Sequence, residues 1–458
     1  MGRQYRFKGL LTEEGWLEDA LVSLDEKGKI RSIESNSSEG EYVDGFALPG
    51  FQNAHSHAFQ YAMAGLAEMH DPAQRNDDFW SWRNSMYKVA LSISPDQLEA
   101  IATMLYAEML RHGYTSVAEF HYLHHDQNGK SYDNPCEMGE RLVVAAQKAG
   151  IRITLVPMFY QKGGFGQEAG EGQRRFLSKT IDDYQALLES TRAMVAQYDH
   201  ASLGSGIHSL RAVAEHDVIQ YGQSMDPTLP FHIHISEQLK EVEACLDYHG
   251  QRPVEWLLNN CPVNKNYHLV HATHLSDAEV EGIAQSGAHV VICPSTEGNL
   301  GDGLFSFDDF KKQGGRWSIG TDSHVGLNPL EELRILDYGQ RTRSHSRETY
   351  VSETSGDSGF NAIQMAWKAG RAAMGASQNH FFGVGESLDC VVMDAQAPLI
   401  AASAAKHLCN TMVYSTDVSN VMGTMVDGEW KVQAGRHLQQ AEITREFIEA
   451  MEEVGVRN

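Results

Sequence analysis

The chain has 458 residues, of which 42% are hydrophobic and 21% are charged, a composition that is ordinary for a globular protein and argues against extensive disorder. Its formal net charge of -24 would repel phosphate backbones and anionic lipid, so we expect no nucleic acid or membrane partner. The chain begins without an apolar signal-peptide core, and its six cysteines form no Cys-X-X-Cys pair. These features predict a soluble, cytoplasmic protein.

Apolar runs that end in polar residues recur eight times, and helical periodicity fills most of the intervals between them. The runs cover residues 46–57, 115–122, 151–159, 202–210, 229–237, 267–274, 289–296 and 317–324. Nearly continuous apolar strands that alternate with helices indicate a parallel sheet covered on both faces. Eight such units predict an α/β fold, a (β/α)8 barrel of the TIM type with its active site at the C-terminal strand ends.

The flanking segments differ from the barrel because they contain short alternating strands. We expect residues 49–385 to form the barrel, with residues 1–48 and 386–436 pairing into one small composite β-sandwich. Residues 437–458 have helical periodicity and predict a final helix. The glycine-rich segment 161–176 lacks the Gly-Lys-Ser/Thr ending of a phosphate loop, so we expect either a mobile lid or a plain surface loop.

Three histidines and an aspartate lie at the ends of these predicted strands. His55 and His57 are one residue apart and would leave the same face of the first strand. His234 ends the fifth strand and Asp322 ends the eighth. A lone His-X-His pair is more often structural, but all four side chains would converge in a closed barrel. They suit one divalent ion, with zinc favoured and iron possible, and a position left open to water would make the site catalytic.

The motifs PGFQNAHSH, HIHISE, LVHATH and GTDSH resemble the amidohydrolase superfamily, in its branch of deaminases with one metal ion. HAFQYAMAG, TSVAEFHYLHH, GIHSLRAV, CPSTEGNLGDG and GTDSHVGLNPLEELR resemble the formimidoylglutamate deiminases within it. From about residue 5 to residue 440, the resemblance implies one zinc ion per chain and a homodimer. It also implies hydrolysis of an anionic amidine, N-formimino-L-glutamate, to N-formyl-L-glutamate and ammonia, a step of histidine degradation. The sequence departs from this family at Tyr61, Gly206-Ile207 and Gly298, where arginine, alanine-proline and alanine are usual.

Hydrolytic deimination needs a proton relay, because the nitrogen must leave as ammonia. Glu237, three residues after His234, could be this relay or a carboxylate at a helix N-terminus, and the resemblance favours catalysis. His271 ends the sixth strand and could deprotonate or orient the water. Asp322 could share the base role while it ligates the metal, and the sequence does not divide this work between them.

Recognition of a glutamate tail requires cationic side chains. Arg211 and His208 are the best candidates, since arginine can bind a carboxylate through two parallel hydrogen bonds. Arg83 and Tyr122 could close over the substrate, and Gln60 could bond the formimino nitrogen. Arg83 could equally be a solvated helix residue beside aromatic packing. We expect His232, Trp80 and Trp82 to be core residues. The fourth strand ends GIHSLR, without the lysine that bridges two ions in related sites, so we expect a single ion.

Two other functions remain as alternatives. A deaminase of a purine, pyrimidine or adenosyl compound would keep the same chemistry but would need an aromatic slot for the ring. A barrel that has lost catalysis and serves as a binding or scaffold protein would be expected to lose metal ligands, and none of the four candidates is missing here.

Overall fold

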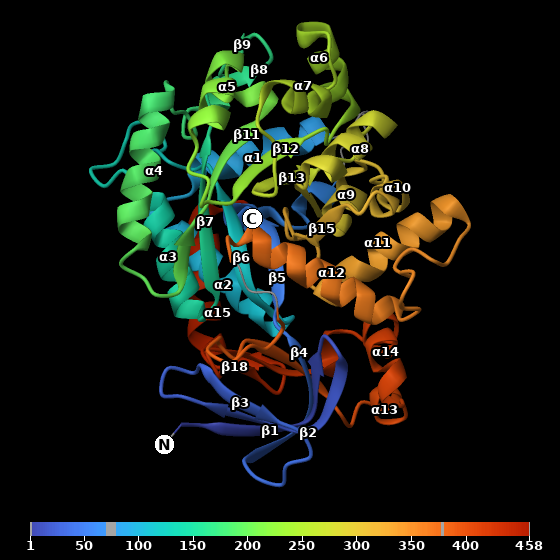
Figure 1. The fold of residues 1–458 in the computed structure, drawn as a ribbon. Helices are drawn as coiled ribbons and strands as arrows, with labels where there is room; N and C mark the ends of the chain where they lie inside the picture. The colour runs from blue at the N-terminus through green and yellow to red at the C-terminus, as the bar shows by residue number, and fades with distance from the viewer. Residues whose placement is uncertain (1, 70–78, 377–379, 458) are drawn as a thin grey trace.

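Eight parallel strands form a barrel in the computed structural model, which describes residues 2–69, 79–376 and 380–457 (Figure 1). In hydrogen-bonded order they are β5 (Phe51–Ser56), β6 (Tyr114–His121), β7 (Arg152–Phe159), β11 (Ser205–Ser209), β12 (Phe231–Ile235), β13 (Tyr267–His271), β14 (His289–Ile292) and β15 (Arg316–Ile319). A bridge between Ser56 and Asp322 brings the last strand end to the first, where the carbonyl of His55 accepts hydrogen bonds from the amides of Thr321 and Asp322. The predicted barrel is confirmed.

Helices cover the outside of the barrel and link its strands. Their bounds are α1 (Phe79–Ser92), α2 (Pro95–Arg111), α3 (Glu137–Ala149), α4 (Ile181–Val195), α5 (Glu215–Ser224), α6 (Leu239–His249), α7 (Pro253–Asn260), α8 (Asp277–Ser286), α9 (Pro294–Leu300), α10 (Phe307–Lys312), α11 (Pro329–Ser344) and α12 (Ser358–Ala373). Local sequence sets many of these ends. For example, α2 begins with a capping box between Ser94 and Gln97, and α3 ends at Gly150 in the left-handed region.

The two terminal segments combine in one eight-stranded sheet below the barrel in Figure 1. Its strands are β1 (Gln4–Thr12), β2 (Gly15–Leu24), β3 (Ile30–Glu34), β4 (Glu41–Pro49), β16 (Cys390–Asp394), β17 (Val421–Val426), β18 (Glu429–Gln433) and β19 (Arg436–His437). The antiparallel pair of β4 with β16 joins the N-terminal strands to the C-terminal ones. Two short helices, α13 (Pro398–Ala401) and α14 (Leu408–Ser415), lie beside this sheet.

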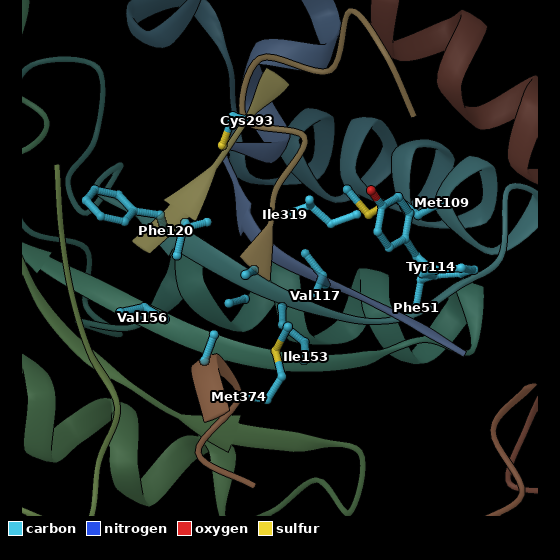
Figure 2. Packing of buried hydrophobic residues seen from close by; sticks show 14 of the residues in the cluster. Phe51, Met109, Tyr114, Val117, Phe120, Ile153, Val156, Cys293, Ile319 and Met374 are labelled. Carbon is cyan, nitrogen blue, oxygen red and sulfur yellow. The ribbon is translucent and has the colours of Figure 1, made fainter. Parts of the chain in front are cut away.

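The predicted strand 46–57 is two strands, because β4 belongs to the terminal sheet and β5 opens the barrel. Gly50 separates them at a point of close approach: a Cβ there would lie 2.2 Å from the Oγ1 of Thr115. Figure 2 shows Val117 and Ile319 close to Met109 of α2, so these apolar side chains pack between the barrel strands and a covering helix. This packing fixes the strands whose ends carry the polar residues.

Three further segments complete the chain. The C-terminal helix α15 (Gln440–Val454) packs on α2, and Arg457 beyond it donates hydrogen bonds to the carbonyls of Ala62 and Ala64. Within 161–176, β8 (Lys162–Gly164) and β9 (Gln167–Glu168) pair as a hairpin, and its opening as a lid stays a prediction. Short β10 (Ala201–Leu203) pairs with β7. Among the described helices, none is long and apolar enough to cross a membrane.

Candidate metal centre and active site

Four buried side chains converge at the C-terminal ends of β5, β12 and β15, as the sequence predicted. The Nε2 atom of His55 lies 3.1 Å from that of His57 and 3.0 Å from that of His234. The Oδ1 atom of Asp322 lies 3.3 Å from the Nε2 atoms of both His55 and His57. Ligands about 2 Å from one ion in a tetrahedron would be about 3.3 Å apart, so these spacings fit a metal of zinc's size.

The hydrogen bonds of two of these histidines fix which ring nitrogen carries the proton. The Nδ1 atom of His57 lies 2.9 Å from the carbonyl oxygen of Phe120, and the Nδ1 atom of His234 lies 3.0 Å from that of His208. A carbonyl only accepts, so each ring donates from Nδ1 and leaves Nε2 as a lone pair. These two lone pairs face each other at 3.3 Å, an arrangement that a cation between them would stabilise.

Burial keeps the imidazoles neutral and the neighbouring histidines keep the aspartate ionised, which is the protonation state that a metal ion requires. Burial, followed by the effect of His57, lowers the pKa of His55 to about 3. Burial also lowers the pKa of His57 and, more strongly, that of His234. Burial alone would raise the pKa of Asp322, but His55 and its neighbours hold it below the usual range.

Glu237 and His271 lie beside this centre and face each other. The Nε2 atom of His271 is 3.6 Å from a carboxylate oxygen of Glu237 and 3.9 Å from the Oδ2 atom of Asp322. Burial raises the pKa of Glu237 to about 7, against the opposing effects of His271 and Arg211. Burial lowers the pKa of His271, yet the carboxylates of Glu237, Glu297 and Asp322 together raise it to about 10. The pair therefore holds groups that can exchange protons near neutral pH.

Backbone strain accompanies these strand ends. His271 has a φ of 68°, Asp322 of 48° and Ser236, next to Glu237, of 53°. Non-glycine residues seldom adopt this left-handed region, and such strain concentrates where a fold aims side chains into a site. The chain therefore turns sharply after these strands and directs the side chains inward.

Three buried carboxylates near the centre were missed by the sequence analysis. The Oε1 atom of Glu297 lies 3.2 Å from the Nδ1 atom of His271. Asp302 forms one group with Glu237 and His271, in which burial and then Glu237 raise the pKa of Asp302 to about 9. Glu119 accepts hydrogen bonds from the Ser56 hydroxyl, the Ala58 amide and the Tyr106 hydroxyl, and so supports the His55–His57 turn from below. All three lie in motifs that carry the family resemblance: Glu119 in TSVAEFHYLHH, and Glu297 and Asp302 in CPSTEGNLGDG.

One pocket opens onto the metal centre, and every substrate contact proposed from the sequence lines it. These side chains are Gln60, Arg83, Tyr122, His208 and Arg211, together with Glu237, His271 and Asp322. The amide nitrogen of Gln60 donates to the hydroxyl of Tyr122 at 3.1 Å, and its buried Oε1 atom has no partner among the described residues. The Nε atom of Arg83 likewise lacks one. The pocket thus offers a free acceptor and a free donor.

Arg83 and Arg211 have different surroundings. The guanidinium of Arg83 lies 4.3 Å from the ring centre of Trp80, which gives it both aromatic packing and a place in the pocket. Arg211 is paired by its Nη1 atom with Glu241 at 2.9 Å, while its Nη2 atom lies 3.9 Å from Glu237. Part of the Arg211 charge is therefore balanced before any ligand binds.

Aromatic residues form much of the pocket wall, which the sequence analysis underestimated. Trp82 is half-buried: it packs against the core, as expected, but it also lines the pocket. Other aromatic lining residues are Phe79, Tyr87, Tyr160 and Phe176. In contrast, His232 is fully buried and bonds the carbonyl of Ala373, as expected of a core residue. Tyr61 lies outside the pocket lining and packs on Phe447 of α15.

Comparison with known proteins gives three findings that agree with this geometry. The amidohydrolase family matches residues 46–431. The chain is 42% identical, over 97% of its length and 98% of the relative's, to a formimidoylglutamate deiminase from Pseudomonas aeruginosa. It is 25% identical, over 90% of its length and 88% of the relative's, to a 5-methylthioadenosine/S-adenosylhomocysteine deaminase from Haloarcula marismortui.

Solved structures show the same fold. A crystal structure of an amidohydrolase from Brucella melitensis superposes with a TM-score of 0.93 at 39% identity, covering 99% of this chain and 100% of that one. A zinc-bound adenosine deaminase from Xanthomonas campestris superposes with a TM-score of 0.82 at 19% identity, covering 99% and 98%. At that lower identity the similarity concerns the fold alone.

Proposed function

The chain belongs to the amidohydrolase family, and from this premise we propose that it is a zinc-dependent hydrolase that converts N-formimino-L-glutamate to N-formyl-L-glutamate and ammonia. The activity of the Pseudomonas aeruginosa relative, which is 42% identical over nearly the whole chain, supports this substrate. The reaction adds the oxygen of water to the formimino carbon and breaks the bond from that carbon to the terminal nitrogen. It is a step of histidine degradation.

One observation carries the proposal: the pocket that contains Glu237, His271 and Asp322 also holds groups suited to both ends of this substrate. The free Oε1 atom of Gln60 can accept a hydrogen bond from the amidine nitrogen. At the other end, Arg83 and Arg211 provide positive charge for carboxylates in a chain of net charge -24. A cationic amidine with an anionic tail therefore matches the charges of the pocket.

The chain's own carboxylates and imidazole handle the protons. Glu237, with a pKa of about 7, can take a proton as water attacks and return it to the departing nitrogen. His271 faces Glu237 at 3.6 Å, so it can share that proton or stabilise the oxygen that develops at the attacked carbon. Their closeness lets one proton move between water and nitrogen without reaching solvent.

The donor set supports zinc as the resident ion, held by His55, His57, His234 and Asp322. When bound, such an ion lowers the pKa of a coordinated water towards neutrality. Iron would also accept three imidazoles and a carboxylate, so the metal content has to be measured.

A deaminase of an amino-heterocycle is the second candidate, and the aromatic wall of the pocket favours it. Trp82, Tyr87 and Tyr122 could stack on a ring, and a relative with such a function is 25% identical. The same rings can also hold a cationic amidine by cation–π contact. The arginines and the higher identity support the amidine.

We also propose that the protein acts in the cytoplasm as a homodimer without nucleic acid or membrane partners. The six cysteines are all free and buried, which suits a reducing compartment. The charge of -24 opposes binding to polyanions. The dimer rests on the family resemblance alone, and sedimentation of the purified protein would test it.

Ammonia release from N-formimino-L-glutamate, measured with metal content on the same sample, tests the function. We expect turnover with about one zinc per chain, loss of turnover on chelation and recovery on adding zinc. Adenosine and S-adenosylhomocysteine, assayed in parallel, test the second candidate. A zinc-loaded protein that deaminates a heterocycle and leaves the amidine intact would overturn the proposed substrate.

A further inference from the structure

The imidazole of His271 is held from its two edges by different carboxylates. Its Nε2 atom faces Glu237 at 3.6 Å and Asp322 at 3.9 Å, towards the metal centre. Its Nδ1 atom lies 3.2 Å from the Oε1 atom of Glu297, which comes from α9. The side chain of Glu297 is only 5% exposed, so solvent screens this contact little.

We propose that Glu297 is a positioning residue that holds the His271 imidazole in the orientation and tautomer that hydrolysis needs. The inference rests on the proposed hydrolytic function. A carboxylate that accepts the Nδ1 proton leaves Nε2 as the atom that can take or hold a proton beside Glu237. Without Glu297 the ring could rotate, or in its neutral form carry its one proton on Nε2 instead of Nδ1.

Glu297 is itself well fixed, as this role requires. Its Oε1 atom accepts a hydrogen bond from the amide of Cys293 at 2.9 Å, in addition to the contact with His271. Its backbone amide bonds the carbonyl of Cys293, and its carbonyl accepts the amide of Asp302. The left-handed backbone at His271 and Ala272 carries strain, so a side-chain contact that fixes the ring has a clear structural purpose.

The shared Oε1 atom makes Glu297→Gln an informative change. The Cys293 amide should keep the glutamine oxygen in place, so the variant retains the Nδ1 proton of His271 and loses only the negative charge. Glu297→Ala removes both the charge and the hydrogen bond. We expect kcat to fall about 10-fold in Glu297→Gln and about 100-fold in Glu297→Ala, with KM within about threefold of wild type.

Glu332→Gln is the matched control. Glu332, on α11, is also a buried carboxylate that contacts α9: it accepts a hydrogen bond from the amide of Ser295 at 2.9 Å, and its hydrogen bonds among the described residues do not include His271. This variant should keep the wild-type kcat. If it loses as much kcat as Glu297→Ala, the loss of a carboxylate that stabilises α9 explains both results, and the positioning role of Glu297 is overturned.

The experiment measures kcat, KM and zinc content of the full-length variants. A crystal structure of zinc-loaded Glu297→Ala shows whether the imidazole ring of His271 has changed its orientation. A kcat within twofold of wild type for Glu297→Ala, or an effect on KM alone, overturns the proposal. If Glu297→Ala fails to fold or bind zinc, the kcat of Glu297→Gln decides. If wild type releases no ammonia, the proposed function fails, and an unmoved His271 ring in the crystal structure would separately refute positioning.

Discussion

At Glu237, burial favours the protonated carboxyl, whereas His271 and Arg211 favour the ionised one. This balance gives the side chain a pKa of about 7, which suits a group that both takes and returns a proton. Glu237→Gln should therefore retain zinc and substrate affinity and lose turnover by about 10²- to 10⁴-fold. Ammonia release would measure the turnover, binding of the intact substrate would measure the affinity, and metal analysis would measure the retained zinc.

Glu243→Gln is a suitable control for that variant, because Glu243 lies exposed on α6 a short distance along the chain. It should behave as wild type. Near-normal turnover in Glu237→Gln would identify Glu237 as a structural residue and leave His271 and Asp322 to move the protons.

Among the elements, β7 carries the main ionic link between the barrel and the terminal sheet. Arg152 at its start pairs with Asp389 at 2.7 Å and with Asp427, which follow β7 by more than two hundred residues. Its side chain is 22% exposed, so removing it would leave two partly buried carboxylates without their cation. Arg152→Met should lower the free energy of unfolding by about 2 kcal/mol.

Chemical denaturation of the zinc-loaded proteins would measure this loss, with Arg3→Met as the comparison. Arg3 also bridges distant segments, but its pair with Glu429 is about half exposed on both sides. An exposed pair contributes about 0–1 kcal/mol, so equal losses in the two variants would argue against a special role for Arg152.

The contact of α11 with α9 should make stability depend on pH. Burial raises the pKa of Glu332, on α11, to about 8, so the folded protein keeps a proton that the unfolded chain releases near its ordinary value of 4.5. Because the folded state binds more protons in this interval, stability falls as pH rises from about 4.5 to about 8. Glu332→Gln cannot lose that proton. The melting temperature of Glu332→Gln, relative to that of wild type, should therefore rise between pH 5 and pH 8.5. If the difference between the two melting temperatures stays constant over this interval, this assignment is refuted.

Buried barrel strands were predictable because each one reads as a continuous apolar run. The convergence of the candidate metal ligands was predictable for a related reason: His55, His234 and Asp322 lie in the last few residues of such runs. The boundary between β4 and β5 was not, since both strands are apolar and only Gly50 separates them. The contact between Glu297 and His271 depends on how the chain folds around α9, and no local sequence pattern encodes such a long-range arrangement.

At the scale of the whole molecule, the metal centre joins strands that are far apart in sequence. Its ligands come from β5, β12 and the end of β15, and their nitrogen and oxygen atoms all lie within 4.8 Å of one another. Without an ion, the lone pairs of His57 and His234 face each other in a buried site. An ion that binds only the folded chain stabilises it by about 2.7 kcal/mol when free metal is 100 times the Kd.

Zinc removal should therefore lower the melting temperature of the entire protein by several degrees and abolish ammonia release, and added zinc should restore both. His234→Ala removes one ligand and should lose zinc during purification. Its melting temperature should then be similar with and without added zinc. Calorimetric scans of chelated, reloaded and variant protein would measure this. If chelated wild type, shown to be metal-free, melts at the same temperature as the reloaded protein, the ion does not hold β5, β12 and β15 together, and packing of the barrel core alone sets the stability.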